Sequence, residues 1–315
     1  MSETTTGGIR LTMGPVEWLL VVILSLLWGG SFFFVEIALE ALQPLTIVAL
    51  RVGIAAVALH LVLLASGRTM PGGLGLWAAF FGMGLINNAV PFTLIAWGQV
   101  HIGSGLAAIL NATMPIFVVL VAQVATDDEK VNRARFAGIA LGFAGVAVLI
   151  GPAALADIGS NVVAQLAVLG AALSYSCGVV FGRRFARLGI NPLATATGQV
   201  TAAAIILAPF ALAVDQPWHL AAPGLGVWGA IGGLGVLSTG LAYIIYFRIL
   251  AVAGATNLSL VTFIVPASAI LLGTIVLGER LHITHIAGIV LIAAGLIAID
   301  GRLLKRRAPQ PGPAD

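Results

Sequence analysis

The sequence predicts an all-α membrane protein of ten transmembrane helices. Apolar residues make up 60% of the 315 residues and charged residues only 9%, against about 25% charged residues in ordinary soluble domains. Long apolar stretches alternate with short polar ones, and a helix crosses about 30 Å of hydrocarbon at about 1.5 Å per residue. The two halves of the chain also resemble each other, which groups the ten helices into two repeats of five.

The expected spans follow the apolar stretches in chain order. We place them at 16–38, 44–66, 74–97, 104–125, 133–151, 163–186, 192–214, 225–250, 254–277 and 283–303. The first stretch opens with Glu17 and Trp18 and is too long for a signal peptide, so we expect it in the mature protein. The single cysteine, Cys177, lies inside the sixth span, where we expect it to pack rather than to form a disulfide.

The basic residues predict the orientation in the membrane. If the N-terminus is cytoplasmic, 13 of the 15 Lys and Arg residues fall in cytoplasmic segments, and only Arg51 and Arg280 remain for the other side. Both termini are therefore expected in the cytoplasm, as tails at 1–15 and 304–315. The net charge of +3 then reflects topology, and no nucleic-acid partner is expected.

An internal repeat divides the chain. The segment "LGLWAAFFGMGLINNAVPF" at 74 aligns without gaps to "LGVWGAIGGLGVLSTGLAY" at 225, an offset of 151 residues that also pairs Pro115 with Pro266. We expect a first repeat at 16–152 and a second at 163–303. Because five spans are an odd number, the second repeat enters the membrane in the opposite sense. Inverted repeats are typical of transporters that open a midplane site to either side in turn.

Polar residues stand inside the third and eighth spans at equivalent positions. Asn87 and Asn88 of the first repeat align with the pair Ser238–Thr239 of the second. Polar side chains in lipid cost free energy unless they are hydrogen-bonded, and Pro91 in the same run removes a backbone hydrogen bond. A pseudo-two-fold axis in the membrane plane would bring both pairs near one central cavity, where we expect the substrate.

Several segments together resemble a known family. They are "LLWGGSFF" in the first span, "PLTIVALRVGIAA" in the second, the proline-containing fourth and ninth spans, and "LGERLHITHIAGIVLIAAGLIAI" at the end. From about Trp18 to Arg302 the chain resembles the EamA-type members of the drug/metabolite transporter (DMT) superfamily, and within it the bacterial YddG-like amino-acid exporters. The resemblance implies export of small metabolites across the bacterial inner membrane, through a cavity lined mainly by the third, fourth, eighth and ninth helices.

Nine residues are expected to line this cavity and bind substrate. Amides and hydroxyls can bind both the carboxylate and the ammonium of an amino acid, and aromatic rings can hold an ammonium by cation–π attraction. The alternatives are interhelical hydrogen bonding for the polar residues and ordinary packing for the aromatic ones, most of all for Tyr246 near the inner end. The nine are Trp28, Asn87, Asn88, Asn111, Tyr175, Ser238, Thr239, Tyr243 and Thr262.

Prolines and small residues suggest where helices bend and touch. Pro91, Pro115 and Pro266 are candidate gating hinges, because a proline inside a helix frees a carbonyl; a static kink is the alternative. The stretch "GIALG" at 138, with Gly145, forms a small-residue face suited to close helix contact, either inside the protein or in a dimer.

Arg51 is the one basic residue placed well inside a span. A charge there costs about 2–3 kcal/mol unless it is solvated or paired. The side chain could snorkel outward, pair with Glu36 of the first span, or hold a substrate carboxylate.

Three rival functions remain open at this stage. An intramembrane enzyme is disfavoured, because none of the five histidines sits mid-span beside a candidate serine. A passive channel and an efflux carrier for drugs such as quaternary ammonium compounds are harder to separate from an amino-acid exporter. We expect a small-molecule solute and membrane lipid as partners and no cofactor or metal ion, and we leave the oligomeric state open, a monomer included.

Overall fold

The computed structural model describes residues 13–125, 133–150, 158, 161–268 and 283–300, and every regular element in these ranges is a helix. The first half contains α1 (Pro15–Leu39), α2 (Pro44–Ala65), α3 (Leu74–Gly84), η1 (Leu85–Ala89), α4 (Val90–His101), α5 (Ser104–Asn111), α6 (Met114–Ala125) and α7 (Arg133–Ile150). The second half contains α9 (Val162–Arg187), α10 (Pro192–Phe210), η2 (Ala211–Asp215), η3 (Pro217–His219), α11 (Leu225–Gly232), η4 (Gly233–Leu241), α12 (Ala242–Ser259) and α14 (Ile283–Asp300).

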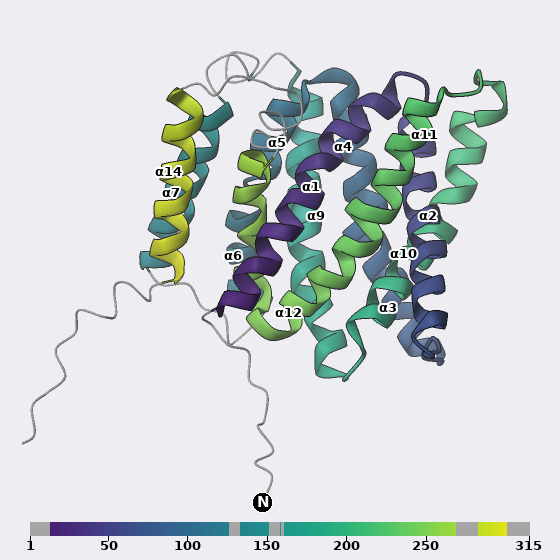
Figure 1. Cartoon of the computed structure of the whole chain (residues 1–315), viewed down its shortest axis with the longest axis horizontal. Helices are drawn as coiled ribbons and strands as arrows, with labels where there is room; N and C mark the ends of the chain where they lie inside the picture. Colours follow the sequence, from purple (N-terminus) through teal and green to yellow (C-terminus); the bar gives the residue numbers. More distant parts are fainter. Residues whose placement is uncertain (1–12, 126–132, 151–157, 159–160, 269–282, 301–315) are drawn as a thin grey trace, which may run out of the picture.

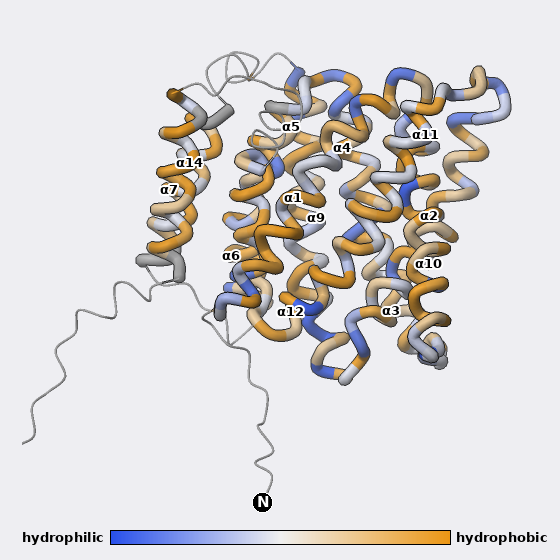
Figure 2. Tube along the Cα trace, in the orientation of Figure 1, coloured by the Kyte–Doolittle hydropathy of each residue, from blue (hydrophilic) through white to orange (hydrophobic). Residues whose placement is uncertain are grey.

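The helices have the length and composition of membrane spans. Seven helical stretches of the described chain are long and apolar enough to cross a membrane, and shorter apolar helices lie at Phe136–Val148, Asn257–Ser268 and Ile286–Ala298. Figure 2 shows hydrophobic residues along the helices and hydrophilic ones gathered mainly at their two ends. The expected all-helical membrane architecture is confirmed, while the count of ten spans stays a prediction, because parts of the last two expected spans and both tails lie outside the described residues.

Local sequence signals explain where several helices begin. Proline is the first residue of α1, α2 and α10, where its missing N–H would be unpaired in any case. Asn161 and Asn191 cap α9 and α10, each accepting a hydrogen bond from a backbone N–H of the first turn. Within α12 the helix breaks at Gly254, whose φ of 81° favours glycine. This break falls where the ninth span was expected to start.

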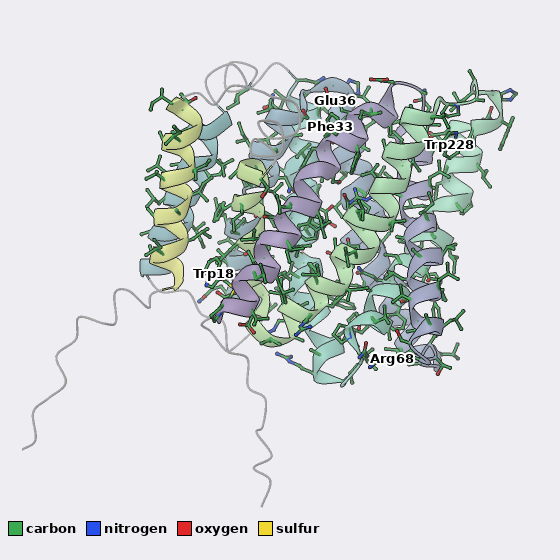
Figure 3. All side chains as sticks on the ribbon, in the orientation of Figure 1. Trp18, Phe33, Glu36, Arg68 and Trp228 are labelled. Atoms are coloured by element: carbon green, nitrogen blue, oxygen red, sulfur yellow. The ribbon has the colours of Figure 1, made fainter. Side chains whose placement is uncertain are left out.

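The helices of the bundle run between two opposite ends, which residues labelled in Figure 3 distinguish. Trp18 at the start of α1 and Arg68 after α2 lie at one end, which we call the Arg68 end. Glu36 in the last turns of α1 and Trp228 in α11 lie at the opposite end, the Glu36 end. The helix α3 begins shortly after Arg68, whereas α11, its repeat equivalent, begins at the other end. Equivalent segments of the two halves therefore cross the bundle in opposite directions (Figure 1).

Both repeats contain a π-helical segment at the same place. The segment η1 joins α3 to α4, and η4 joins α11 to α12, and the two segments overlap when the halves are aligned at the offset of 151 residues. A π-helical turn closes hydrogen bonds over five residues, so it shifts the faces of the helix on either side of it. Such segments are frequent at functional sites, and both of these adjoin the central cavity described below.

The helices α7 and α14 pack against each other at one side of the bundle, and α7 also contacts α5 (Figure 1). A Cβ atom added to Gly295 would lie 2.7 Å from the carbonyl oxygen of Gly138 and from the amide nitrogen of Gly142. A Cβ atom on Gly145 would meet the amide nitrogen of Ile292 at 2.7 Å. The small-residue face at 138–145 therefore serves internal helix packing.

Candidate functional site

A central cavity of about 60 Å³ lies between the two halves. Its wall is built from α1, α2, η1 with α4, the α5–α6 break, α9, α12 and the helix Asn257–Ser268. The volume holds several water molecules. A cavity lined by both repeats at mid-helix depth is where an inverted-repeat transporter places its substrate.

Arg51 brings a positive charge to the wall of the cavity. Its Nε donates a hydrogen bond to the hydroxyl of Thr239 at 2.7 Å, and its guanidinium lies 3.7 Å from the centre of the Phe92 ring. The side chain is 6% exposed. Among the described residues no acidic side chain pairs with it, and Glu36 does not reach it. Stacking and a single hydrogen bond leave the terminal nitrogens, which are the natural donors to a carboxylate, available to the cavity.

A second polar bridge mirrors the Arg51 bridge across the molecule. Asn87 Nδ2 donates to Gln199 Oε1 at 3.2 Å and thereby joins η1 to α10. When Pro44 is aligned with Pro192, Gln199 is the repeat equivalent of Arg51. Each bridge joins the second helix of one repeat to the π-helical segment of the other, so the two halves are linked twice through equivalent helices, although Thr239 corresponds to Asn88 rather than to Asn87 at the offset of 151 residues. Only the bridge between Arg51 and Thr239 contains a charged side chain.

Tyr243 replaces the hydrogen bond that Pro91 removes. Pro91 has no N–H to donate to the carbonyl of Asn87, four residues earlier. The Tyr243 hydroxyl donates to this carbonyl at 3.0 Å and accepts a hydrogen bond from Asn88 Nδ2 at 2.8 Å. Tyr243 of the other repeat thus holds the Asn88 amide and the backbone carbonyl beside the proline, while Gln199 holds the Asn87 amide.

Aromatic rings form much of the remaining wall. Trp28 lies 5.9 Å from Tyr246 between ring centroids, and Tyr243 meets Tyr246 edge-on at 5.5 Å. On the opposite side, Phe92 meets Tyr175 at 6.1 Å. These rings offer an apolar surface with polar tips, which suits the side chain of a small organic solute.

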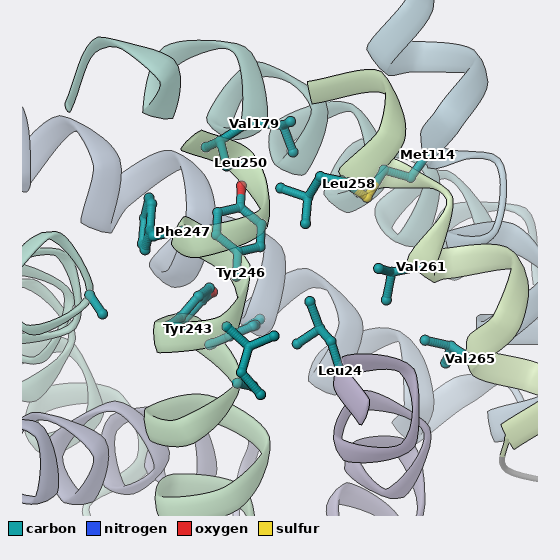
Figure 4. Close-up of a cluster of buried hydrophobic side chains, with 14 of the residues drawn as sticks. Leu24, Met114, Val179, Tyr243, Tyr246, Phe247, Leu250, Leu258, Val261 and Val265 are labelled. Carbon is teal, nitrogen blue, oxygen red and sulfur yellow. The ribbon is translucent and has the colours of Figure 1, made fainter. Parts of the chain in front are cut away.

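The cavity is closed towards the Arg68 end by apolar side chains. Figure 4 shows this cluster, in which Val179, Leu250 and Leu258 surround the hydroxyl end of Tyr246. All four side chains are at most 2% exposed. No hydrogen-bond partner for the Tyr246 hydroxyl occurs in the described part of the chain. We call Val179, Leu250, Leu258 and their neighbours Leu24, Phe247 and Val261 the inner barrier.

A second pocket opens at the Glu36 end. It has a volume of about 450 Å³ and is lined by Glu36, Glu40, Gln43, Gln99 and Ser104 together with apolar neighbours. Gln99 belongs to the walls of both this pocket and the central cavity. The central cavity is therefore separated from the Glu36 end by little more than one layer of side chains, whereas the inner barrier closes the other end.

The structure brings most of the expected residues together. The expected residues in the cavity wall are Trp28, Asn87, Asn111, Tyr175, Tyr243 and Thr262, and Arg51 joins them. The other three expected residues lie behind the wall: Asn88 binds Tyr243, Thr239 binds Arg51, and Ser238 donates to the carbonyl of Leu27 at 2.7 Å. The repeat alignment paired these polar positions but did not show which of them face the cavity, and their role in substrate binding stays a prediction.

The three prolines are buried and stand at helix junctions or inside a helix. Pro91 follows η1 as the second residue of α4, and Pro115 is the second residue of α6, directly after the break that separates α5 from α6. Pro266 lies within the helix Asn257–Ser268. The first two adjoin interruptions of regular α-helix, as hinges require, and the hinge role itself stays a prediction.

Sequence reasoning missed several residues of the wall. Gln99 was not singled out, because it stands near the end of an apolar span, where polar residues are common. Phe92 was overlooked, although its repeat equivalent Tyr243 had been named. The other unexpected members are residues of types that are common in packed helices, namely Ser31, Phe32, Val35, Ile47, Val48, Ile95, Ala96, Met114 and Val265.

The helical bundle and its shared cavity define the class of the protein: a multi-pass membrane protein built from two related halves. The chain belongs to the EamA-like transporter family, which it matches over residues 16–151 and 162–299. The expectation of an EamA-type DMT transporter is therefore confirmed.

Relatives along nearly the whole chain agree with this assignment. The chain is 26% identical to the uncharacterized transporter YoaV of Bacillus subtilis, over 88% of this chain and 94% of YoaV. It is also 26% identical to the uncharacterized inner membrane transporter YedA of Escherichia coli, with 92% of each chain covered. A crystal structure with 22% sequence identity has the same fold, with a TM-score of 0.76 over 93% of this chain and 99% of that chain.

Proposed function

We propose that the protein exports amino acids or related small metabolites across the bacterial inner membrane by alternating access. The observation that carries this proposal is the Arg51 guanidinium, which is stacked on Phe92 in the cavity wall and has no acidic partner among the described residues. A buried charge of this kind is costly unless something pairs with it. A solute carboxylate meets that need, and the neighbouring aromatic rings accept an apolar side chain.

The architecture supports a carrier of ten helices in two inverted repeats, at 16–152 and 163–303. The distribution of Lys and Arg along the sequence predicts that the segment containing Arg68 is cytoplasmic, so we assign the Arg68 end to the cytoplasm together with both termini. The Glu36 end then faces the outside. The inner barrier is several buried side chains thick, whereas Gln99 borders both the central cavity and the pocket at the Glu36 end, so release of the solute towards the outside requires less rearrangement than its return to the cytoplasm.

The charge of the cavity disfavours the rival substrates. A quaternary ammonium drug would enter beside the Arg51 cation and meet no compensating acid in the described wall, so like charges would oppose its binding. A phosphorylated solute calls for several cations, and the wall offers one. A zwitterionic or anionic solute with an apolar side chain fits the groups that are present.

Transport by the purified protein in proteoliposomes tests this proposal. Radiolabelled amino acids, aromatic ones included, should enter saturably in wild-type vesicles and not in empty ones. The substitution Arg51→Gln should lower the uptake by about tenfold or more, because a hydrogen bond to a charged group is lost. Arg68→Gln, the same change on an exposed arginine away from the cavity, is the matched control. Uptake that rises linearly without saturation would indicate a channel, and quaternary ammonium uptake without amino-acid uptake would indicate drug efflux.

A further inference from the structure

Two amide oxygens of the cavity wall lack hydrogen-bond partners. Gln99 Oε1 and Asn111 Oδ1 are both buried, and neither has a partner in the described part of the structure. Both residues line the central cavity, Gln99 from α4 and Asn111 from the last turn of α5. A buried carbonyl oxygen without a partner destabilises the protein, so two of them around one small cavity indicate a missing donor.

Gln99 stands where a solute must pass. Its side chain lines both the central cavity and the pocket at the Glu36 end. Its Nε2 donates to the backbone carbonyl of Phe32 in α1 at 3.4 Å, while its Oε1 is buried without a partner in the described structure. The amide is therefore anchored through its nitrogen and keeps one unused acceptor.

The repeat gives Gln99 a counterpart at the closed end of the cavity. At the offset of 151 residues Gln99 corresponds to Leu250, and Phe32 corresponds to Val179 when Trp28 is aligned with Tyr175. Leu250 and Val179 are members of the inner barrier. Gln99, near the Glu36 end of the cavity, is thus a polar amide, whereas its repeat equivalent in the inner barrier is the apolar Leu250. Packing alone therefore does not account for Gln99.

We propose that Gln99, assisted by Asn111, binds the ammonium group of the solute and so makes the transporter prefer amino acids to the corresponding carboxylic acids. The inference rests on the proposed function, in which Arg51 holds the carboxylate. An ammonium has three N–H donors and no acceptor, which matches carbonyl oxygens. A neutral amide suits this task better than an acid, because an acidic side chain in the same cavity would compete with the solute for Arg51.

Calorimetric titration of the full-length protein in detergent tests this assignment. Phenylalanine is compared with hydrocinnamate, which lacks the ammonium, and with phenethylamine, which lacks the carboxylate; leucine, isocaproate and isoamylamine form a second set. The variants are Gln99→Leu, which installs the residue of the repeat equivalent, and Gln99→Met, which keeps the length of the side chain. Gln43→Leu is the control, because Gln43 lines the outer pocket and not the central cavity.

Wild type should bind each amino acid about tenfold more tightly than its deaminated analogue, the effect of one hydrogen bond to a charged group. Both Gln99 variants should reduce this ratio to about threefold or less and leave the affinity for the deaminated acid unchanged, while Gln43→Leu keeps the wild-type ratio. Equal wild-type affinity for amino acid and deaminated acid, or an unchanged ratio in the Gln99 variants, would overturn the role of Gln99 but not that of Arg51. Tighter binding of the amines than of the acids, or no binding of any of these compounds, would contradict the proposed function and this inference together.

Discussion

Arg51 of α2 donates a hydrogen bond to Thr239 of η4, and this contact joins the two repeats beside the cavity. The Thr239 hydroxyl also donates to the carbonyl of Leu234 at 2.7 Å, so its oxygen is oriented to accept from Arg51. The π-helical segment η4 therefore positions the guanidinium over the Phe92 ring. Thr239 contacts Arg51 and is not itself part of the cavity wall, so the proposed binding of a carboxylate depends on Thr239 only through Arg51.

The substitution Thr239→Val should weaken binding of carboxylate solutes without unfolding the protein. Valine keeps the shape of threonine but removes the acceptor, so Arg51 loses its orientation and keeps its charge. We expect a fall in affinity of about three- to tenfold, from the loss of one hydrogen bond to a charged group. Thr201→Val is the control, because the Thr201 hydroxyl bonds only to the carbonyl of Thr197 in its own helix. Equal affinity of Thr239→Val and wild type would show that Thr239 does not position Arg51.

Tyr243 and Tyr246 lie one helical turn apart in α12 and should respond oppositely to the same change. Replacing Tyr243 by Phe removes two hydrogen bonds, to Asn87 and Asn88, and should destabilise the protein by about 1–2 kcal/mol. Replacing Tyr246 by Phe removes a buried hydroxyl that has no partner in the described structure, and should stabilise it by about 1 kcal/mol. Thermal unfolding in detergent compares the two variants, and a lower melting temperature for Tyr246→Phe than for Tyr243→Phe would contradict this account.

Much of the architecture was predictable from the sequence. The apolar stretches located the helices and the start of the ninth span at Gly254, where the helix breaks, and the repeat alignment paired the polar positions of the two halves, because hydrophobic length and equivalent positions are properties of the sequence itself. The residues that face the cavity were less predictable. Asn87 lines the wall and Asn88 does not, because neighbouring residues of a helix point about 100° apart and the sequence does not show which of the two faces the cavity.

The site also depends on contacts between segments far apart in the chain. Nothing local to Gln199 shows that it meets Asn87, 112 residues earlier. Gln99 stayed unnoticed for a related reason: a polar residue near the end of a span is common, and only the three-dimensional structure shows that it borders two pockets. The types of residue in the site could be read from the sequence. Which of these residues face the cavity depends on how α4 packs against α1 and α9.

Asp215 caps α2 from the other repeat. Its Oδ2 accepts hydrogen bonds from the backbone N–H of Thr46 at 2.6 Å and from the Thr46 hydroxyl at 2.9 Å. An N–H in the first turn of a helix has no partner within the helix, and a negative charge there is favourable. Asp215→Ala should therefore cost about 1–2 kcal/mol of stability, and Asp215→Asn less. The melting temperature should therefore be lowest for Asp215→Ala, intermediate for Asp215→Asn and highest for wild type. Glu40→Ala, which changes an exposed acid at the same end of the bundle, is the control and should unfold close to wild type.

Gly295 should not tolerate even a methyl group. A Cβ atom there would approach the Gly138 carbonyl oxygen and the Gly142 nitrogen at 2.7 Å, and neither backbone atom can move without separating α7 from α14. We expect Gly295→Ala to destabilise the protein by about 1–3 kcal/mol, the usual cost of overpacking. Gly53→Ala is the matched control, because nothing lies within 4 Å of an added Cβ atom there and alanine favours helix by up to about 1 kcal/mol. Thermal unfolding should thus show a lower melting temperature than wild type only for Gly295→Ala. Equal melting temperatures of Gly295→Ala and wild type would mean that α7 and α14 are not held by direct backbone contact.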